Sequence, residues 1–513
     1  MLQLVRGFCG LDVGTTSTKA YVLSQDGKLL VMHRSSYPLH EPEPGHWELD
    51  PGEVLKAIQE TVRHVARRCD EDGVSIESLA ISALGEAILF LDQDGNPLTG
   101  SPVSMDYRGA PYMAAVESAF GRSQIYRRTG QPLHPMYSVF KMAWMKEKRP
   151  DLYSKTAMIC DWQGFLVGRL CGEYVTDRSL ATRMLLYDAE ADRWWDEMVE
   201  FAGRAPEHLP KVLPSGKVAG RLTPEGAAFL GLKAGTPVVL GGWDQACAAF
   251  AAGVREGILL DALGTTQALV TAVSAKALPT GMDALGYQVT PGAREGERLL
   301  VGGSLNGALF VRWWTELCTS FGASPDDLTP DKVLEQHGDA PSSIIALPYI
   351  TGRGTPEVDT SPLGSLIGIS YATGNTDILT AIIDSVSYEV RCNIEALREK
   401  GVPITQIYAS GGPTYSTRWM QRKPNIYGLP VTAVTDPEGS ARGAALLAGL
   451  GIGGLDADAI IQRDLTECRV YTPDPAVVEQ HEQRFQIYRR LYPALRDAFF
   501  GTSGRSGSSF SAS

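Results

Sequence analysis

One strand-and-turn pattern occurs in both halves of the chain, and it constrains the fold more than any other feature. In the first half, an apolar run over residues 8–13 enters Gly14-Thr15-Thr16-Ser17. In the second half, an apolar run over residues 258–263 enters Gly264-Thr265-Thr266. Short apolar runs bounded by Gly and hydroxyl residues predict buried strands that end in tight turns. The pattern therefore predicts two halves built on one plan, and not a short solenoid period.

Local signals around these strands predict an alternation of strands and helices. Asp26-Gly27 predicts a hairpin turn, and Asp50-Pro51 predicts the start of a helix with Asp as its N-cap. In the second half, we expect a long helix over residues 377–400, a strand over residues 406–409 and an Ala-rich helix after Ser440. This alternation predicts an α/β fold.

The length of the chain predicts more than one hydrophobic core. Its 513 residues exceed the roughly 250–300 at which single cores stop growing. We expect an N-terminal domain over residues 1–248, a C-terminal domain over 249–495 and a disordered Gly- and Ser-rich tail over 496–513. Apolar residues make up 44% and charged residues 21%, which is typical of a chain that folds.

Charge and cysteine usage exclude several classes of partner. The net charge of −12 argues against nucleic acid, because that binding depends on clustered Lys and Arg. A small polyanion such as a nucleotide can still bind, because backbone N–H groups and Mg²⁺ supply local positive potential. Eight cysteines without a CxxC pair favour the cytoplasm over a disulfide framework or a zinc site. The most apolar stretch, residues 238–254, is interrupted by Trp243-Asp244-Gln245, so we expect no membrane span.

The first turn carries the groups that a nucleotide needs. A carboxylate ends the strand, hydroxyls follow in the turn and a cation comes after them, in the order Asp12, Thr15, Thr16, Ser17 and Lys19. Hydroxyls and free N–H groups suit a phosphate, and the carboxylate suits Mg²⁺. A tight hairpin explains a single Gly-Thr-Thr about equally well. The second copy, at Gly264, favours two phosphate-binding turns around a nucleotide held between two domains.

Three further segments are candidates for the site. Asp244 lies in an apolar segment, where a carboxylate is costly unless it caps a helix or takes part in chemistry, for example as a general base. Ser410-Gly411-Gly412-Pro413 follows a predicted strand and allows a close approach to a ribose or a flat ring, although any such connection can carry Gly-Gly. Glu86, Asp106 and Arg108 supply charges near the strand ends, and each taken alone favours a surface ion pair.

These residues together resemble the FGGY family of carbohydrate kinases, which includes xylulose, glycerol, gluconate and ribulose kinases. The resemblance runs from Phe8 to about Gly453. It rests on Asp12-Val13-Gly14-Thr15-Thr16-Ser17, on Gly45-His46-Trp47-Glu48-Leu49-Asp50-Pro51, on residues 136–144, and on Gly364-Ser365-Leu366-Ile367-Gly368-Ile369 with the following Asp377-Ile378 and Ala381-Ile382-Ile383-Asp384. It implies two RNase H-like domains of the actin, hexokinase and heat-shock ATPase type, with a nucleotide cleft between them.

The resemblance also implies roles for individual residues. It makes Asp244 the catalytic base and Asp12 the catalytic carboxylate that organises Mg²⁺. The residues implied to bind ATP are Thr15, Thr16, Ser17, Lys19, Gly264, Thr265, Gly307, Gly412 and Ser416. Those implied to contact the acceptor are Gly85, Glu86, Asp106, Asp244 and Gln245. ATP and Mg²⁺ are the implied cofactors, and the oligomeric state stays open, a homodimer being one option.

The chain departs from the family where the acceptor is chosen. Ser104 replaces a Trp, Gly85-Glu86 lacks the Arg typical of glycerol kinases, and the loop after the adenosine motif reads Lys423-Pro424-Asn425. The carboxylates of Glu86, Asp106 and Asp244 would repel an acid, so we expect a neutral ketose or polyol, with xylulose as the first candidate. Gluconate, glycerol, ribulose and erythritol remain alternatives.

Three other classes of protein fit the sequence less well. A sugar- or nucleotide-binding regulator without catalysis predicts a damaged base or Mg²⁺ position, whereas Asp12 and Asp244 are both present. An actin-like ATPase with a protein partner leaves the motif at residues 364–384 unexplained. A Rossmann oxidoreductase needs a GxGxxG after the first strand, which this chain lacks.

Overall fold

The computed structural model describes residues 5–434 and 438–496, and the chain divides into two compact units. The first unit contains Met1–Gly253, Val289–Arg298 and Glu438–Asp464. The second contains Val254–Gln288, Leu299–Pro437 and Leu465–Ser513. Apart from Arg496, the tail predicted over residues 496–513 lies outside the described residues. The first unit thus takes in a segment from late in the chain.

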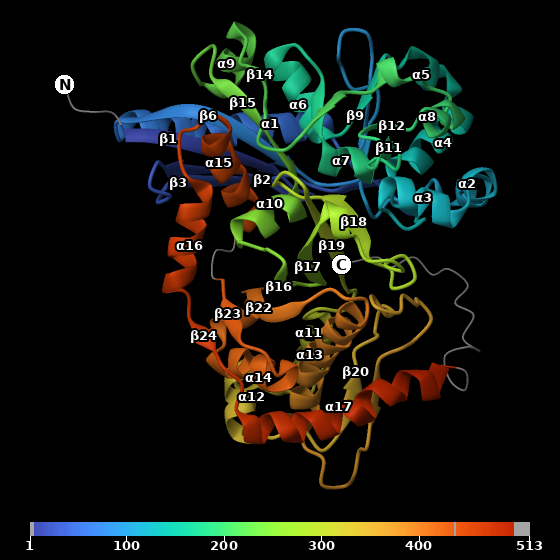
Figure 1. The fold of residues 1–513 in the computed structure, drawn as a ribbon, viewed down its shortest axis with the longest axis vertical. Helices are drawn as coiled ribbons and strands as arrows, with labels where there is room; N and C mark the ends of the chain where they lie inside the picture. Colours follow the sequence, from blue (N-terminus) through green and yellow to red (C-terminus); the bar gives the residue numbers. More distant parts are fainter. Residues whose placement is uncertain (1–4, 435–437, 497–513) are drawn as a thin grey trace. The chain divides into compact units, whose positions relative to one another are not determined.

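The first unit is built on a six-stranded sheet (Figure 1). In sheet order its strands are β14 (Val218–Arg221), β15 (Pro237–Trp243), β6 (Val74–Ala83), β1 (Val5–Val13), β2 (Ser17–Ser24) and β3 (Leu29–Ser36). β1 pairs antiparallel with β2 and parallel with β6, and β6 pairs parallel with β15. The hairpin predicted at Asp26-Gly27 is confirmed, because β2 and β3 are antiparallel neighbours on either side of it.

Two helices cover opposite faces of this sheet. α1 (Pro51–Glu71) contacts β2 and β3, and α15 (Gly439–Gly451) contacts β1, β6 and β15. A Cβ atom on Gly10 would lie 2.1 Å from the carbonyl oxygen of Ala441 in α15, so the close approach of this helix requires glycine. The neighbouring Cys9 lies instead on the side of α1, where burial and, to a lesser extent, the charge of Cys69 raise the pKa of the Cys9 thiol. Since side chains alternate along a strand, Asp12 belongs to the α15 face.

The N-terminus of α1 confirms its predicted cap. The side chain of Asp50 accepts a hydrogen bond from the backbone N–H of Glu53 at 2.9 Å, and Pro51 is the first helical residue. Pro fits there because the first N–H of a helix has no partner within the helix.

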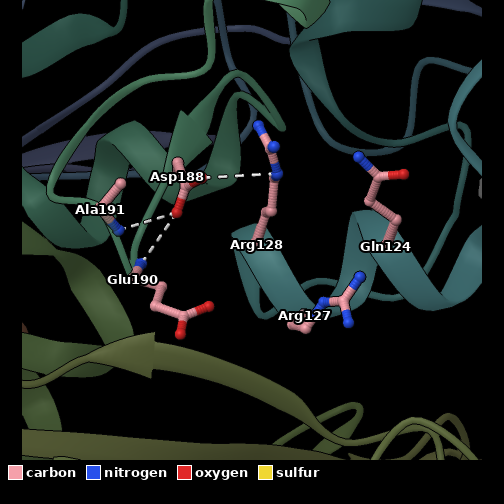
Figure 2. Close-up of a pocket in the computed structure, with 6 residues that line it drawn as sticks. All are labelled: Gln124, Arg127, Arg128, Asp188, Glu190 and Ala191. Carbon is pink, nitrogen blue, oxygen red and sulfur yellow. Dashed lines mark hydrogen bonds and ion pairs between the residues drawn. The ribbon is translucent and has the colours of Figure 1, made fainter.

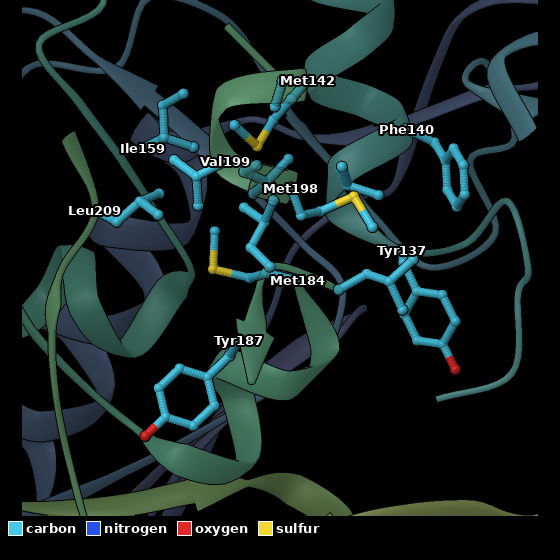
Figure 3. Packing of buried hydrophobic residues seen from close by; sticks show 14 of the residues in the cluster. Tyr137, Phe140, Met142, Ile159, Met184, Tyr187, Met198, Val199 and Leu209 are labelled. Atoms are coloured by element: carbon cyan, nitrogen blue, oxygen red, sulfur yellow. The ribbon is translucent and has the colours of Figure 1, made fainter. Parts of the chain in front are cut away.

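The rest of the first unit is mostly helical and packs around its own apolar core (Figure 3). Tyr137, Phe140 and Met184 are fully or almost fully buried in this core. The helices that contribute to this core are α2 (Met113–Phe120), α3 (Arg122–Thr129), α4 (Ser138–Lys148), α5 (Pro150–Lys155), α7 (Arg178–Arg183) and α8 (Asp196–Phe201). Outside it, α6 (Trp162–Cys171) and α9 (Pro224–Leu230) contact each other, and α9 also contacts α1. The short strands are β4 (His40–Glu43), β5 (His46–Leu49), β7 (Leu89–Leu91), β8 (Ser101–Pro102), β9 (Met158–Cys160), β10 (Val175–Asp177), β11 (Tyr187–Asp188), β12 (Arg193–Trp194) and β13 (Lys211–Leu213).

The strands of the second unit repeat the plan of the first, as the sequence predicts. Their sheet order is β18 (Gln288–Pro291), β19 (Glu297–Ser304), β17 (Gln267–Ser274), β16 (Gly257–Leu263), β22 (Ile404–Gly411), β23 (Val431–Ala433) and β24 (Val470–Tyr471). β16 pairs antiparallel with β17 and parallel with β22, and β22 pairs parallel with β23. The same relations join β1, β2, β6 and β15 in the first unit.

The long helix predicted near residues 377–400 is confirmed as α13 (Asn375–Glu399), and it lies in the main core of the second unit. The other helices there are α11 (Leu309–Ser320), α12 (Pro330–His337), α14 (Thr417–Tyr427) and α17 (Pro475–Leu495), while α16 (Ala457–Glu467) begins in the first unit. The remaining short strands are β20 (Ile345–Leu347) and β21 (Ser365–Ile367). In the part of the chain that the structure describes, no helix is long and apolar enough to cross a membrane.

Candidate active site

The first predicted phosphate turn joins β1 to β2. The N–H of Gly14 donates to the carbonyl of Ser17 at 3.0 Å, and the hydroxyl of Tyr37 donates to the carbonyl of Gly14 at 2.6 Å. Thr16 is exposed at the tip of this turn, and Thr15 is half-buried. The segment is therefore a tight hairpin that also presents a hydroxyl to solvent, so the structural and the phosphate-binding interpretations are compatible.

Asp12 lies at the end of β1 in a buried, polar environment. Its Oδ1 accepts a hydrogen bond from the hydroxyl of Ser82 at 2.9 Å. Burial raises the pKa of this carboxyl, and the charge of Glu438 raises it further, whereas Lys19 and Ser82 lower it. The Nζ of Lys19 lies 2.7 Å from Glu438, so its charge is shared with a residue of the α15 segment. Asp12 thus lacks enough nearby positive charge to offset its burial.

Asp244 is the first residue of α10 (Asp244–Ala251) and follows β15 directly. Its pKa is raised to about 7 by burial and by the charge of Asp12, while the backbone N–H of Gln245 and the charges of Arg183 and Lys19 lower it. The interpretation of Asp244 as a helix N-cap is wrong. Trp243 occupies the cap position without a side-chain bond, because Asp244 itself has entered the helix. Helix capping therefore does not explain why a carboxylate is present at Asp244.

The predicted acceptor loop, Gly85-Glu86, connects β6 to β7. Glu86 has φ +61°, an uncommon conformation for a residue with a side chain. Its carbonyl accepts hydrogen bonds from the hydroxyl of Ser138 at 3.0 Å and from the Nζ of Lys141 at 2.8 Å, and both residues belong to α4. These bonds hold the loop in its strained conformation. The motif at residues 136–144 therefore supports this loop.

The charged side chains near this loop form buried ion pairs, so the expectation of surface ion pairs is wrong. The carboxylate of Glu86 pairs with Arg183, whose side chain is 2% exposed. Asp106 is completely buried and accepts from Arg108 Nη2 at 2.6 Å and from the N–H of Trp47 at 2.7 Å. Packing of the helical core over these groups excludes the water that a surface pair would have.

Sequence reasoning missed Arg183, Lys141 and Ser138. Lys141 and Ser138 lie within the motif at residues 136–144, which was a usable signal, whereas nothing in the local sequence marks Arg183. Burial lowers the pKa of Lys141 to about 7 and that of Arg183 to about 9. Perturbed groups gathered around one loop are typical of functional sites.

The remaining predicted residues lie in the second unit. Gly264 and Thr265 form the turn between β16 and β17, and Gly307 packs against it, since a Cβ there would lie 2.5 Å from the carbonyl oxygen of Thr265. Ser416 caps α14 by accepting from the N–H of Trp419 at 3.1 Å, and Gly412 begins a short 3₁₀ segment just before it. Among the described residues, no group of three or more His, Cys, Asp or Glu forms a metal site.

The segment Lys423-Pro424-Asn425 is helical and buried within α14, so its prediction as a loop is wrong. The Nζ of Lys423 pairs with Asp261 of β16, and both side chains are completely buried. The hydroxyl of Tyr427 also donates to Asp261 at 3.0 Å, and the amide of Gln267 donates to it at 2.6 Å. Lys423 is therefore kept buried by Asp261, which is distant in the sequence, and not by a local sequence preference.

One open cavity of the first unit is lined by residues other than the predicted site residues (Figure 2). Its volume is about 340 Å³, and its lining residues are Gln124, Arg127, Arg128, Asp188, Glu190 and Ala191. The carboxylate of Asp188 accepts from the backbone N–H of Ala191 at 2.9 Å, and Arg128 lies 3.6 Å from it. None of the predicted site residues lines this cavity, so it is separate from the Asp12 and Asp244 site.

Comparisons with known proteins agree with this geometry. The N-terminal domain of the FGGY family of carbohydrate kinases matches residues 8–251, and the C-terminal domain of that family matches residues 262–452. The gluconokinase of Bacillus subtilis (strain 168) is 25% identical over 96% of this chain and 96% of its own. The xylulose kinase of the same strain is 25% identical over 95% of this chain and 97% of its own.

A solved structure supports the same assignment. The crystal structure of the xylulose kinase from Rhodospirillum rubrum has a TM-score of 0.88 and 25% identity, covering 97% of this chain and 100% of that one. Such agreement over nearly the whole length fixes the two-domain, actin-like fold. The chain belongs to the FGGY family of carbohydrate kinases.

Proposed function

We propose that this carbohydrate kinase transfers the γ-phosphoryl group of ATP to a hydroxyl of a neutral ketose or polyol, with a ketopentose such as xylulose as the first candidate. FGGY kinases use ATP as co-substrate. The observation that carries the proposal is Asp244, a carboxylate at the start of α10 with its pKa raised to about 7. A general base is most effective when its pKa lies near the working pH.

In the proposed reaction, Asp244 takes the proton of the acceptor hydroxyl. The hydroxyl oxygen forms a bond to the γ-phosphorus, the bond from that phosphorus to the β,γ-bridging oxygen breaks, and ADP leaves. Phosphoryl transfer of this kind depends mostly on positioning and on charge stabilisation. Asp244 supplies the proton acceptor, and the Gly85-Glu86 loop supplies positioning.

Asp12 is the residue that we propose to hold Mg²⁺. Mg²⁺ binds through one or two carboxylates together with phosphate oxygens and water, so it does not need a cluster of three ligands from the protein. Burial and neighbouring negative charge raise the pKa values of both Asp12 and Asp244, and a divalent cation would relieve that excess charge. When bound with ATP, Mg²⁺ would neutralise charge on the phosphates.

The proposed ATP contacts follow from family resemblance and from position. In the first unit they are Thr15, Thr16, Ser17 and Lys19, which surround the turn after Asp12. In the second unit they are Gly264, Thr265, Gly307, Gly412 and Ser416, at or beside strand ends. Exposed hydroxyls and the N–H groups of Gly-rich turns suit phosphate and ribose.

The charges beside the acceptor loop support a neutral acceptor. Arg183 is committed to Glu86, Arg108 to Asp106, and Lys141 to two backbone carbonyls. Among the described residues around Glu86, these cations already have partners, and Asp244 adds negative charge. An acceptor carboxylate would therefore pay for desolvation without gaining a free counter-ion. Asp106 contributes here by holding Arg108.

A coupled assay of ADP release tests the proposal. We expect kcat/KM for xylulose, ribulose, ribitol or erythritol to exceed the value for gluconate at one fixed MgATP concentration. Two relatives of equal identity carry the names gluconokinase and xylulose kinase, so the comparisons leave this choice to the experiment. A clear preference for gluconate would show that the acceptor pocket holds a cation available to a carboxylate.

A further inference from the structure

Arg183 occupies an unusual place for a cation, at the buried C-terminal end of α7. Its guanidinium lies over the ring of Trp243 at 4.2 Å and over the ring of Tyr137 at 5.3 Å. Its Nη1 donates to the side-chain oxygen of Gln131 at 2.9 Å, and its Nη2 pairs with Glu86. The planar group thus has two aromatic neighbours and two polar partners at once, an arrangement that Lys cannot reproduce.

The helix that carries Arg183 is attached to the segment of the catalytic base. The hydroxyl of Ser179, in the first turn of α7, accepts from the backbone N–H of Trp243 at 2.8 Å. Asp177 caps the same helix by accepting from the N–H of Leu180 at 3.0 Å. Since Asp244 follows Trp243, α7 fixes the backbone just before the base.

Two glycines, Gly85 and Gly242, allow the acceptor loop, the Trp243 ring and α7 to approach one another closely. A Cβ on Gly85 would lie 2.8 Å from Nε1 of Trp243 and 3.2 Å from Nε of Arg183. A Cβ on Gly242, which has φ +132°, would lie 2.9 Å from the hydroxyl of Ser179. The acceptor loop, the Trp243 ring and α7 therefore form one close-packed group. The absence of a side chain at Gly85 makes room for Trp243 and Arg183.

Arg183 and Glu86 form a buried pair of opposite charges. Burial lowers the pKa of Arg183 to about 9, and the charge of Asp244 acts in the opposite direction. Loss of Arg183 would leave the carboxylate of Glu86 buried without its counter-ion, a change that is far more costly than loss of a surface pair.

We propose that Arg183 is a positioning residue of the acceptor site: it holds the Glu86 carboxylate and the Trp243 ring in fixed orientation relative to Asp244, and so determines how tightly a neutral acceptor binds. This inference rests on the proposed function, because Glu86 and Asp244 act on the acceptor there. Arg183 is too buried to touch the acceptor extensively. Its effect is transmitted through the two side chains that it contacts.

Substitutions at Arg183 and Glu86 test the proposal in an ADP-release assay with the best neutral acceptor. In Arg183→Met we expect kcat/KM for the acceptor to fall by about 10²-fold, mainly through a higher acceptor KM, which is the size of loss that misplaced positioning groups cause. The KM for ATP should stay within about twofold, because the proposed ATP contacts lie elsewhere. Arg183→Lys keeps the charge without the planar fork, so it should recover part of the loss.

A double-mutant cycle separates positioning from simple packing. Glu86→Gln combined with Arg183→Met removes both charges, so its thermal unfolding midpoint should recover relative to Arg183→Met alone. The acceptor KM of the double variant should stay high, because the oriented carboxylate is gone. Recovery of both properties together would overturn the proposal, as would equal changes in the KM values for acceptor and ATP.

Two further variants guard against a misfolded protein. Arg178→Met lies on the same short helix, where Arg178 makes a partly exposed ion pair with Asp192, and it should leave both KM values unchanged. Gln131→Leu removes one hydrogen bond to Arg183 and should raise the acceptor KM in the same direction, by less. If Gln131→Leu and Arg183→Lys both bind acceptor as the wild type does, the inference fails while the kinase activity stands. A wild type without activity on any carbohydrate would instead overturn the proposed function.

Discussion

Asp244 and its neighbours show how one residue can combine an ordinary position with unusual chemistry. As the first residue of α10 it would be an unremarkable surface acid in many helices, but burial and Asp12 together raise its pKa to about 7. The same burial that makes a charge costly prepares this carboxylate to accept a proton. The raised pKa of Asp244 is therefore a consequence of its position in the tertiary structure.

Replacement of Asp244 tests its proposed role as the general base directly. Asp244→Asn keeps the shape of the side chain and removes its proton-accepting oxygen, so kcat should fall by about 10²–10⁴-fold while the KM for ATP changes little. Steady-state assays with the best acceptor measure both constants. Asp70→Asn, at an exposed position of α1, is the matched control and should behave as the wild type. Wild-type turnover in Asp244→Asn would show that another group takes the proton.

The raised pKa also predicts a pH dependence. Asp244 is active as the carboxylate, and its pKa is raised from 3.8 to about 7, so the active form is lost as pH falls through about 7. Measured from pH 5 to 8 at limiting MgATP, so that the enzyme without bound metal is probed, kcat/KM should drop about tenfold for each unit below this pKa. A flat profile over that range would mean that Asp244 stays ionised, and thus that its burial is relieved in the working enzyme.

At the scale of elements, the pair between α14 and β16 shows a charge held inside a core. Lys423 and Asp261 are completely buried, and Tyr427 and Gln267 complete the hydrogen bonds of the carboxylate. A buried ion pair contributes little net stability compared with apolar residues of similar volume. Removal of one partner, however, leaves the other charge buried and unpaired. Asp261 lies just before the Gly264 turn, so this pair joins two elements that carry proposed ATP contacts.

Lys423→Met should lower the free energy of unfolding by about 3–5 kcal/mol, because it leaves Asp261 buried and unpaired. Urea unfolding followed by far-ultraviolet circular dichroism measures the change. The double variant Lys423→Met/Asp261→Asn should recover part of it. Lys332→Met, which breaks an exposed pair with Asp327, is the control and should cost at most about 1 kcal/mol. Equal costs for the two single variants would contradict the assignment.

At the scale of the whole molecule, the first unit is not continuous in the chain. α15 lies more than 180 residues beyond Gly253, yet its residues Ala441, Ala444 and Leu447 are completely buried. It packs on the face of β1 that carries Gly10 and Asp12. The face that bears Asp12, the proposed Mg²⁺ ligand, is therefore completed by a segment from late in the chain.

A fragment of residues 1–253 should consequently fail to unfold cooperatively, because the α15 face of its sheet would be exposed to water. Joining residues 438–464 to that fragment through a flexible Gly/Ser linker should restore a cooperative thermal transition. Calorimetry of both fragments compares them. The expectation is wrong if the shorter fragment melts at the same midpoint, and with the same enthalpy, as the longer one.

The sequence by itself determined the local framework of this protein. The β1 strand and its Gly-Thr-Thr turn, the hairpin at Asp26-Gly27, the cap at Asp50 and the second copy of the strand-and-turn pattern all follow from preferences that act over a few residues. The candidates Asp12 and Asp244 were also readable, since each stands at the end of an apolar strand.

Only the tertiary structure decided which charges meet. Arg183 finds Glu86 across 97 positions, and Lys423 finds Asp261 across 162. Local sequence predicted surface ion pairs in the first case and a loop in the second. Both predictions failed for the same reason: whether a charge stays in water or enters a core depends on elements that pack over it from elsewhere in the chain, and short-range preferences carry no information about that packing.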